Sequence, residues 1–131
     1  MTTDDLHALE TCADAVARNA LALKLADART PGLAEVLARL IQRPDLAKTR
    51  GTLVHALGML DCAPHAALLV DLAITGGFEV AHEAVSALER VEGLAEADVR
   101  RVRARLESAR AAGAVEDWRQ DLLDEAWVLF G

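Results

Sequence analysis

The chain has 131 residues, 53% of them hydrophobic but only 3% aromatic, and carries a formal net charge of −7 at pH 7. This length suits one domain, and the 48 Ala and Leu residues favour helices over strands. Nucleic acids and anionic membranes attract clustered positive charge, so the acidic balance argues against nonspecific binding to either and leaves a basic protein partner open. Two cysteines are too few for a disulfide framework, and the acidic N-terminus is unlike a signal peptide, so we expect a cytoplasmic protein.

Helix signals begin at the N-terminus. Thr2, Thr3 and Asp4 are residue types that cap helices, and they introduce a predicted helix over residues 3–29. The apolar residues of this segment recur at steps of three and four, which places their side chains on one face. They are Leu6, Leu9, Ala13, Val16, Ala20 and Leu23. The sequence therefore predicts one long amphipathic helix here.

Four shorter helices are predicted between residues 31 and 92. Proline and glycine separate them, at "TPG" (30–32), "RPD" (43–45), Pro64 and "GG" (76–77). The helix after Pro64 is apolar nearly all round, as expected of a helix that is covered on several sides at the centre of a core. The inward residues of the other three are Leu33, Val36, Leu37 and Leu40, then Leu53, Leu57 and Leu60, then Phe78, Ala81, Val85 and Leu88.

Two further helices are predicted, over residues 96–111 and 115–130. In the first, Val99, Val102 and Leu106 face inward, while the arginines spread over the solvent side without an aromatic residue on which a base could stack. The inward anchors of the second are Leu122, Leu123, Trp127 and Phe130. With no strand signal, the chain is predicted to be all-α with about seven helices.

Part of the sequence repeats. Moving it by 31 positions aligns residues 49–60 with residues 80–91, and moving it by 32 positions aligns residues 35–40 with residues 67–72. Two helical hairpins of nearly equal length therefore lie in tandem. A hairpin of this kind buries its apolar face only by stacking on a neighbour, so we expect the units to share a core.

The short helix pairs, with a "V-x-A-L" segment in the second helix of each pair, resemble HEAT and armadillo repeats. The resemblance implies a right-handed stack of antiparallel helical hairpins, a HEAT-like α-solenoid. It implies a single helical-repeat domain over residues 1–131. The core hairpins would cover residues 31–92, and the capping helices residues 3–29 and 95–130.

In stacked hairpins the second helices commonly line one face, and the 31-residue shift predicts which residues form rows across it. The pairs are Lys48 with Glu79, Thr52 with Glu83, His55 with Ser86, and Met59 with Arg90. All lie off the buried stripes, and steps of three or four keep them on one side of each helix. We interpret these eight residues as a partner-binding row, with ordinary exposed helix positions as the alternative.

The last predicted helix is strongly acidic and offers a secondary partner-binding surface. Its carboxylates are opposed only by Arg119 and lie beside Trp118, Trp127 and Phe130. They are Glu116, Asp117, Asp121, Asp124 and Glu125. Aromatic residues rimmed by charge suit a binding hot spot, whereas a polar outer face is also what a terminal repeat needs for solubility.

The sequence gives less support for a metal-binding or catalytic site. Cys62 and His65, with His55 and His82, are ligand types for zinc, but a second close pair is missing, and no glycine-rich phosphate loop or serine elbow is present. His82-Glu83 resembles the motif of HEAT-repeat di-iron hydroxylases, but the preceding repeat has glycine and threonine at the equivalent positions. We therefore expect no catalytic residue, metal or cofactor.

These observations predict a noncatalytic module that binds another protein. A small acidic chain of this kind resembles the HEAT-type immunity proteins that accompany bacterial toxins, which implies an inhibitor whose partner is a basic toxin domain. The alternatives are a HEAT-like metal- or cofactor-dependent enzyme and a scaffold or adaptor subunit of a larger complex. The sequence does not indicate the oligomeric state.

Overall fold

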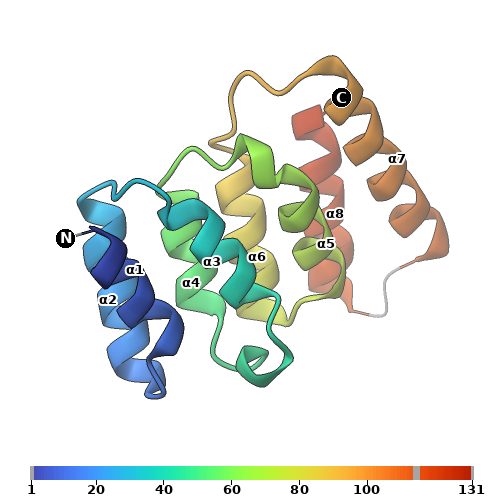
Figure 1. Cartoon of the computed structure of the whole chain (residues 1–131). Helices are drawn as coiled ribbons and strands as arrows, with labels where there is room; N and C mark the ends of the chain where they lie inside the picture. The colour runs from blue at the N-terminus through green and yellow to red at the C-terminus, as the bar shows by residue number, and fades with distance from the viewer. Residues whose placement is uncertain (1, 114–115, 131) are drawn as a thin grey trace. The chain divides into compact units, whose positions relative to one another are not determined.

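The computed structural model describes residues 2–113 and 116–130, and these residues form eight α-helices and two short 3-10 helices with no strand (Figure 1). The predicted all-α class is confirmed. The helices group into two compact units, Met1–Asp61 and Cys62–Gly131, each with its own apolar interior. No helix in the described part of the chain has the length and apolar character needed to cross a membrane.

The first unit contains four α-helices, α1 (Thr2–Thr11), α2 (Ala15–Asp27), α3 (Leu33–Ile41) and α4 (Gly51–Gly58), with a 3-10 helix at Pro44–Leu46 between α3 and α4. Helix α4 packs against α2 and α3, and α1 packs against α2 and α3. The predicted stripe of α3 is buried, as are Leu53 and Leu57 of α4.

The prediction of a single helix over residues 3–29 is wrong. This segment forms two helices, which raises the number of α-helices from about seven to eight among the described residues. The chain leaves the helix at residues 12–14, where Asp14 adopts an extended conformation and its carboxylate accepts a hydrogen bond from the Ala17 N–H at 2.8 Å. This cap starts α2 in a new register. Val16, which we expected to be buried, is therefore 78% exposed, and Ala22 and Leu25 form the inward face.

The second unit contains α5 (Ala66–Thr75), α6 (Phe78–Leu88), α7 (Glu96–Ala112) and α8 (Asp117–Phe130), with a 3-10 helix at Ala63–His65 before α5. Helix α5 packs against α6, α7 and α8, which confirms the central position expected from its apolar sequence. Val115, the expected start of the last helix, lies outside the described residues.

One predicted core residue of this unit is not in the core. Phe78 is 60% exposed, whereas Ala81, Val85 and Leu88 of the same predicted stripe are buried. Phe78 is the first residue of α6, directly after Gly77, so its ring lies at the end of the helix and not over the apolar interior. This exposed ring becomes part of the candidate site.

Candidate functional site

Half of the residues in the predicted partner-binding row are exposed, two in each unit. Lys48 and His55 are exposed in the first unit, and Glu79 and Arg90 are exposed in the second. The other four residues of the row are half-buried; they are Thr52, Met59, Glu83 and Ser86. Because the two halves belong to different units, their alignment into one row stays a prediction.

The most distinctive surface feature is a cluster of three rings in the second unit, formed by Phe78, His82 and Trp118 and called here the ring cluster. The Phe78 ring centroid lies 4.1 Å from that of His82 and 5.1 Å from that of Trp118, edge to face at 71°. The centroids of His82 and Trp118 are 5.6 Å apart. Helices α6 and α8 supply the rings, and these helices pack side by side.

Backbone contacts hold the ring cluster in place. His82 lies four residues after Phe78, one helical turn away, and its Nδ1 is 2.7 Å from the Phe78 carbonyl oxygen. A carbonyl only accepts hydrogen bonds, so Nδ1 is the donor in this contact. The His82 ring is thereby fixed against one side of Phe78.

Arg119 fixes the other helix of the cluster. It is buried, and its guanidinium donates to the carbonyl oxygens of Ala73 at 3.0 Å and Gly76 at 2.7 Å, which lie at the C-terminal end of α5. The last carbonyls of a helix lack partners within the helix and attract a cation. Arg119 therefore caps α5 while it anchors the first turn of α8, and with it Trp118.

The same guanidinium organises its neighbours on α8. It donates to both carboxylate oxygens of Glu116, at 2.9 and 3.1 Å, and this hydrogen bonding lowers the pKa of Glu116. The Arg119 guanidinium carbon also lies 4.5 Å from the centroid of the Trp118 ring. Glu116 is thus committed to an internal ion pair and does not belong to a free docking surface.

The predicted secondary surface divides into paired and unpaired carboxylates. Asp124 accepts a hydrogen bond from Arg110 at 2.9 Å, so it joins α8 to α7. Asp117, Asp121 and Glu125 are exposed and form no ion pair within the described residues. Their spacing of four places them along one side of α8. We call these three residues the acidic stripe.

Trp127 has a structural role. Its ring lies 4.9 Å from the guanidinium carbons of both Arg103 and Arg110, which come from α7. Cations over an aromatic face stabilise a contact between helices. Of the two tryptophans in the sequence, only Trp118 therefore belongs to the candidate docking surface.

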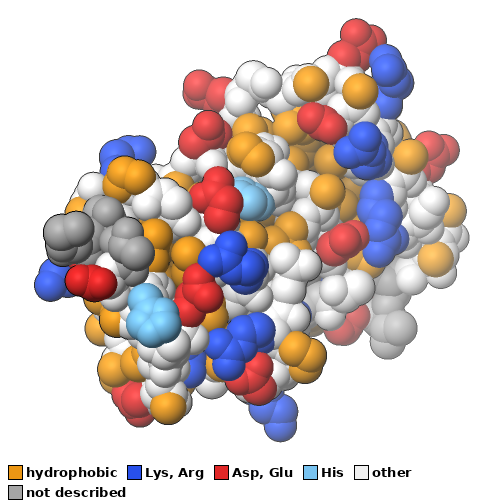
Figure 2. All heavy atoms as spheres, viewed as in Figure 1, with side chains coloured by type: hydrophobic (Ala, Val, Ile, Leu, Met, Phe, Trp, Pro, Cys, Tyr) orange, Lys and Arg blue, Asp and Glu red, His pale blue; other side chains and the backbone are white. Residues whose placement is uncertain are grey.

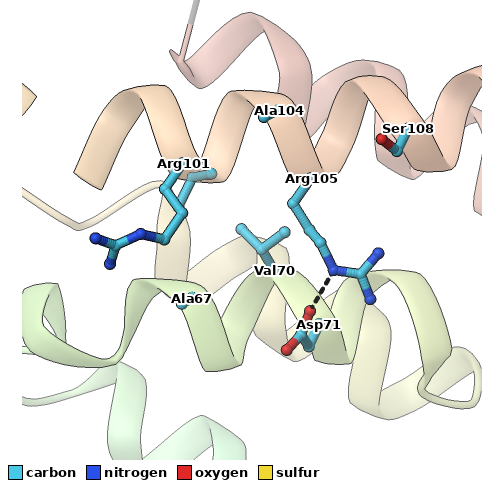
Figure 3. Close-up of a pocket in the computed structure, with 8 residues that line it drawn as sticks. Ala67, Val70, Asp71, Arg101, Ala104, Arg105 and Ser108 are labelled. Atoms are coloured by element: carbon cyan, nitrogen blue, oxygen red, sulfur yellow. Dashed lines mark hydrogen bonds and ion pairs between the residues drawn. The ribbon is translucent and has the colours of Figure 1, made fainter. Parts of the chain in front are cut away.

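A groove with a volume of about 420 Å³ lies between α5 and α7 in the second unit (Figure 3). Ala67 and Val70 lie at its α5 side. Arg105 reaches across it to Asp71 at 2.9 Å, and Arg101 is paired with Asp98. Figure 2 shows basic side chains over α7 with apolar side chains exposed beside them.

The groove is lined by one hydroxyl, that of Ser108, and one carboxylate, that of Asp71. The carboxylate is paired with Arg105, and none of the eight lining residues is a histidine or cysteine that could activate the hydroxyl or act as a nucleophile. Across the described residues no group of three His, Cys, Asp or Glu side chains could hold a metal ion. Cys62 is buried, with its Sγ 3.7 Å from the Ala87 carbonyl oxygen.

That Phe78 and His82 belong to the candidate site was not predicted from the sequence. The signal was nevertheless present, because "GGFEVAH" places two rings one turn apart directly after a helix stop. Trp118 was predicted as part of a docking surface, but its contact with Phe78 joins residues 40 positions apart and has no local signal. Comparison with known proteins adds no further assignment, since no family model, curated protein or solved structure matches the chain.

Proposed function

We propose that the chain is a noncatalytic helical-repeat module that binds and inhibits a basic protein in the cytoplasm, as an immunity protein binds a toxin. One observation carries the proposal. The exposed ring of Phe78 contacts Trp118 of α8, and the same helix carries the acidic stripe, whose exposed carboxylates have no ion-pair partner among the described residues. Aromatic residues within a charged rim are typical of protein-binding hot spots.

The position of the acidic stripe along α8 supports a partner rather than local helix stabilisation. Carboxylates in the first turn of a helix interact favourably with the helix dipole, and this accounts for Asp117. Asp121 and Glu125 lie beyond that turn, so the dipole does not account for them. Unpaired exposed carboxylates at these positions increase the negative potential that attracts a basic partner and raise the association rate.

The helix pairs support the repeat architecture that belongs to this proposal. Within the first unit α3 packs against α4, and within the second unit α5 packs against α6. These are the two pairs that the 31- and 32-residue shifts relate in sequence. The right-handed stack of HEAT-like hairpins in one domain, and the single partner-binding row that it would create, remain predictions.

The experiment first recovers the partner from native cells by crosslinking to the tagged protein, and requires a basic protein at a stoichiometric ratio. Calorimetry then compares the wild type with a triple variant of the acidic stripe, Asp117→Lys, Asp121→Lys and Glu125→Lys. We expect the variant to bind about 10- to 150-fold more weakly, since three reversed charges each change the interaction by ~0.5–1 kcal/mol. The inhibitor proposal further requires that an equimolar amount of the wild type abolish the partner's activity.

A matched control separates a local effect from a change in net charge. Asp27, Glu89 and Glu92 are exposed carboxylates that do not lie on α8, and their change to lysine alters the net charge equally. This control should bind within about threefold of the wild type, because dispersed charges contribute weakly. An acidic partner, or equal losses in the two triple variants, would contradict the proposal.

A further inference from the structure

The ring cluster presents one aromatic ring that is both exposed and held. Phe78 is 60% exposed, yet His82 and Trp118 contact its ring at centroid distances of 4.1 and 5.1 Å. An exposed phenyl ring that is already held in place loses little conformational entropy when a partner covers it. Phe78 is therefore preorganised as a contact point.

The chemistry of the cluster favours a cation over an apolar group. The face of an aromatic ring carries partial negative charge and attracts guanidinium and ammonium groups. Within the ring cluster the protein itself already makes this contact, since Arg119 lies over Trp118 at 4.5 Å. That guanidinium is neutralised by Glu116 and engaged by the carbonyls of α5, so Phe78 is the ring of the cluster left for a second cation.

The charged residues around the ring cluster also favour a cation. Glu79 follows Phe78 and is exposed, and Asp117 and Asp121 flank Trp118 at positions one before and three after it. The N-terminal ends of α6 and α8 each contribute a partial positive charge of about one half. These partial charges oppose the negative charges of Glu79, Asp117 and Asp121 without cancelling them.

We propose that the ring cluster receives an arginine side chain of the basic partner, which stacks on Phe78 while carboxylates of α6 and α8 accept its N–H groups. The proposal rests on the protein-binding function proposed above. Arginine fits better than lysine, because its planar guanidinium stacks on a ring and still donates hydrogen bonds at its edge.

The test uses N-acetylargininamide as a probe and follows the two tryptophan indole N–H signals by NMR. We expect a saturable shift of the Trp118 signal, with a dissociation constant on the order of 10 mM for so small a ligand. The Trp127 signal should stay unchanged, because Arg103 and Arg110 already lie over that ring. N-acetylcitrullinamide has nearly the same shape without the charge and should produce no saturable shift.

The variant Phe78→Leu removes the ring but keeps an apolar side chain at an exposed position, so folding should be unaffected. We expect it to abolish the Trp118 shift. An equal response to the citrulline probe, a shift that persists in Phe78→Leu, or no shift at Trp118 would overturn the proposal.

The recovered partner separates failure of this inference from failure of the proposed function. If the arginine anchor is correct, Phe78→Leu weakens the partner about tenfold or more, within the range expected for a hot-spot side chain. If the acidic-stripe variant loses the partner while Phe78→Leu binds within twofold of the wild type, the anchor is wrong and the function stands. If no basic partner exists but the probe still shifts Trp118, the function is wrong and the ring cluster remains a cation site.

Discussion

The replacement Arg119→Met tests the structural basis of the candidate site. Methionine retains the apolar stem of arginine but none of its five N–H donors. The guanidinium of Arg119 donates to the carbonyl oxygens of Ala73 and Gly76, both near the C-terminal end of α5, and to the carboxylate of Glu116. The variant therefore removes the cap of α5 and the anchor of the first turn of α8 in one step.

The expected loss of stability follows from the two hydrogen bonds that Arg119 donates to carbonyl oxygens. A buried carbonyl that loses its donor costs about 1–3 kcal/mol, so the two together cost roughly 2–6 kcal/mol. We expect Arg119→Met to lower the free energy of unfolding by about 3 kcal/mol, in line with other buried charged groups that lose their partners. Arg119→Lys keeps the charge but not the planar fork, so it should fall between the wild type and the methionine variant.

The measurement is urea unfolding followed by far-ultraviolet circular dichroism, because both tryptophans lie in the second unit and fluorescence would report on that unit alone. Arg18→Met is the matched control. Arg18 is also buried, but only its Nη2 has an acceptor, the Cys12 carbonyl at 2.9 Å. Its Nε and Nη1 are buried without a hydrogen-bond partner among the described residues.

The two arginines should therefore respond in opposite directions. A buried charge with unsatisfied donors is costly, so Arg18→Met should leave the free energy of unfolding unchanged or raise it by up to about 2 kcal/mol. A loss below about 1 kcal/mol in Arg119→Met would refute the capping argument. Equal losses in both variants would show that burial of the arginine stem, and not its hydrogen bonding, determines the stability.

Two further predictions concern the core and the response to acid. Leu57→Ala in α4 should lower the free energy of unfolding by about 2–5 kcal/mol, because the side chain is fully buried. Val16→Ala should change it by less than ~0.5 kcal/mol, and urea unfolding of this variant checks the corrected register of α2. A hydrogen bond from Arg119 lowers the pKa of Glu116, and one from Arg43 lowers the pKa of Asp45. The stability that these carboxylates contribute is therefore present above about pH 4, and it is lost as the pH falls through their lowered pKa values. Glu116→Gln should consequently lose less stability than the wild type between about pH 5 and pH 3 in acid titrations, and an identical pH dependence would contradict the pairing.

The sequence predicted the parts of the fold that depend on local spacing. Helices α3 to α6 follow from apolar steps of three and four between proline and glycine stops. The four inward residues expected in α3 are buried, together with Ala38 and Ile41. The break before α2 was missed because Ala13 and Val16 continue the apolar spacing across it. A single capping side chain, that of Asp14, outweighs this pattern and resets the register.

The site was predicted in part, for the same physical reason. The exposure of Asp117, Asp121 and Glu125 follows from the helical pattern of α8, so it could be inferred locally. The pairing of Asp124 with Arg110 joins two helices, and nothing in the spacing of either helix indicates it. Local patterns thus indicate which side chains face solvent, whereas the identity of their partners depends on how helices pack.

Trp118 and Arg119 are consecutive residues of α8, and together they link the stability of the second unit to its candidate docking surface. Neighbouring residues on a helix point in different directions, so α8 directs Arg119 inward to the end of α5 and keeps Trp118 half-exposed against Phe78. Loss of Arg119 should therefore weaken both folding and partner binding, because the same anchor positions the ring cluster. Loss of the Phe78 ring should weaken binding alone, since the ring contacts its neighbours from an exposed position and caps no buried group. The two variants thus separate a residue that positions the surface from a residue that forms it.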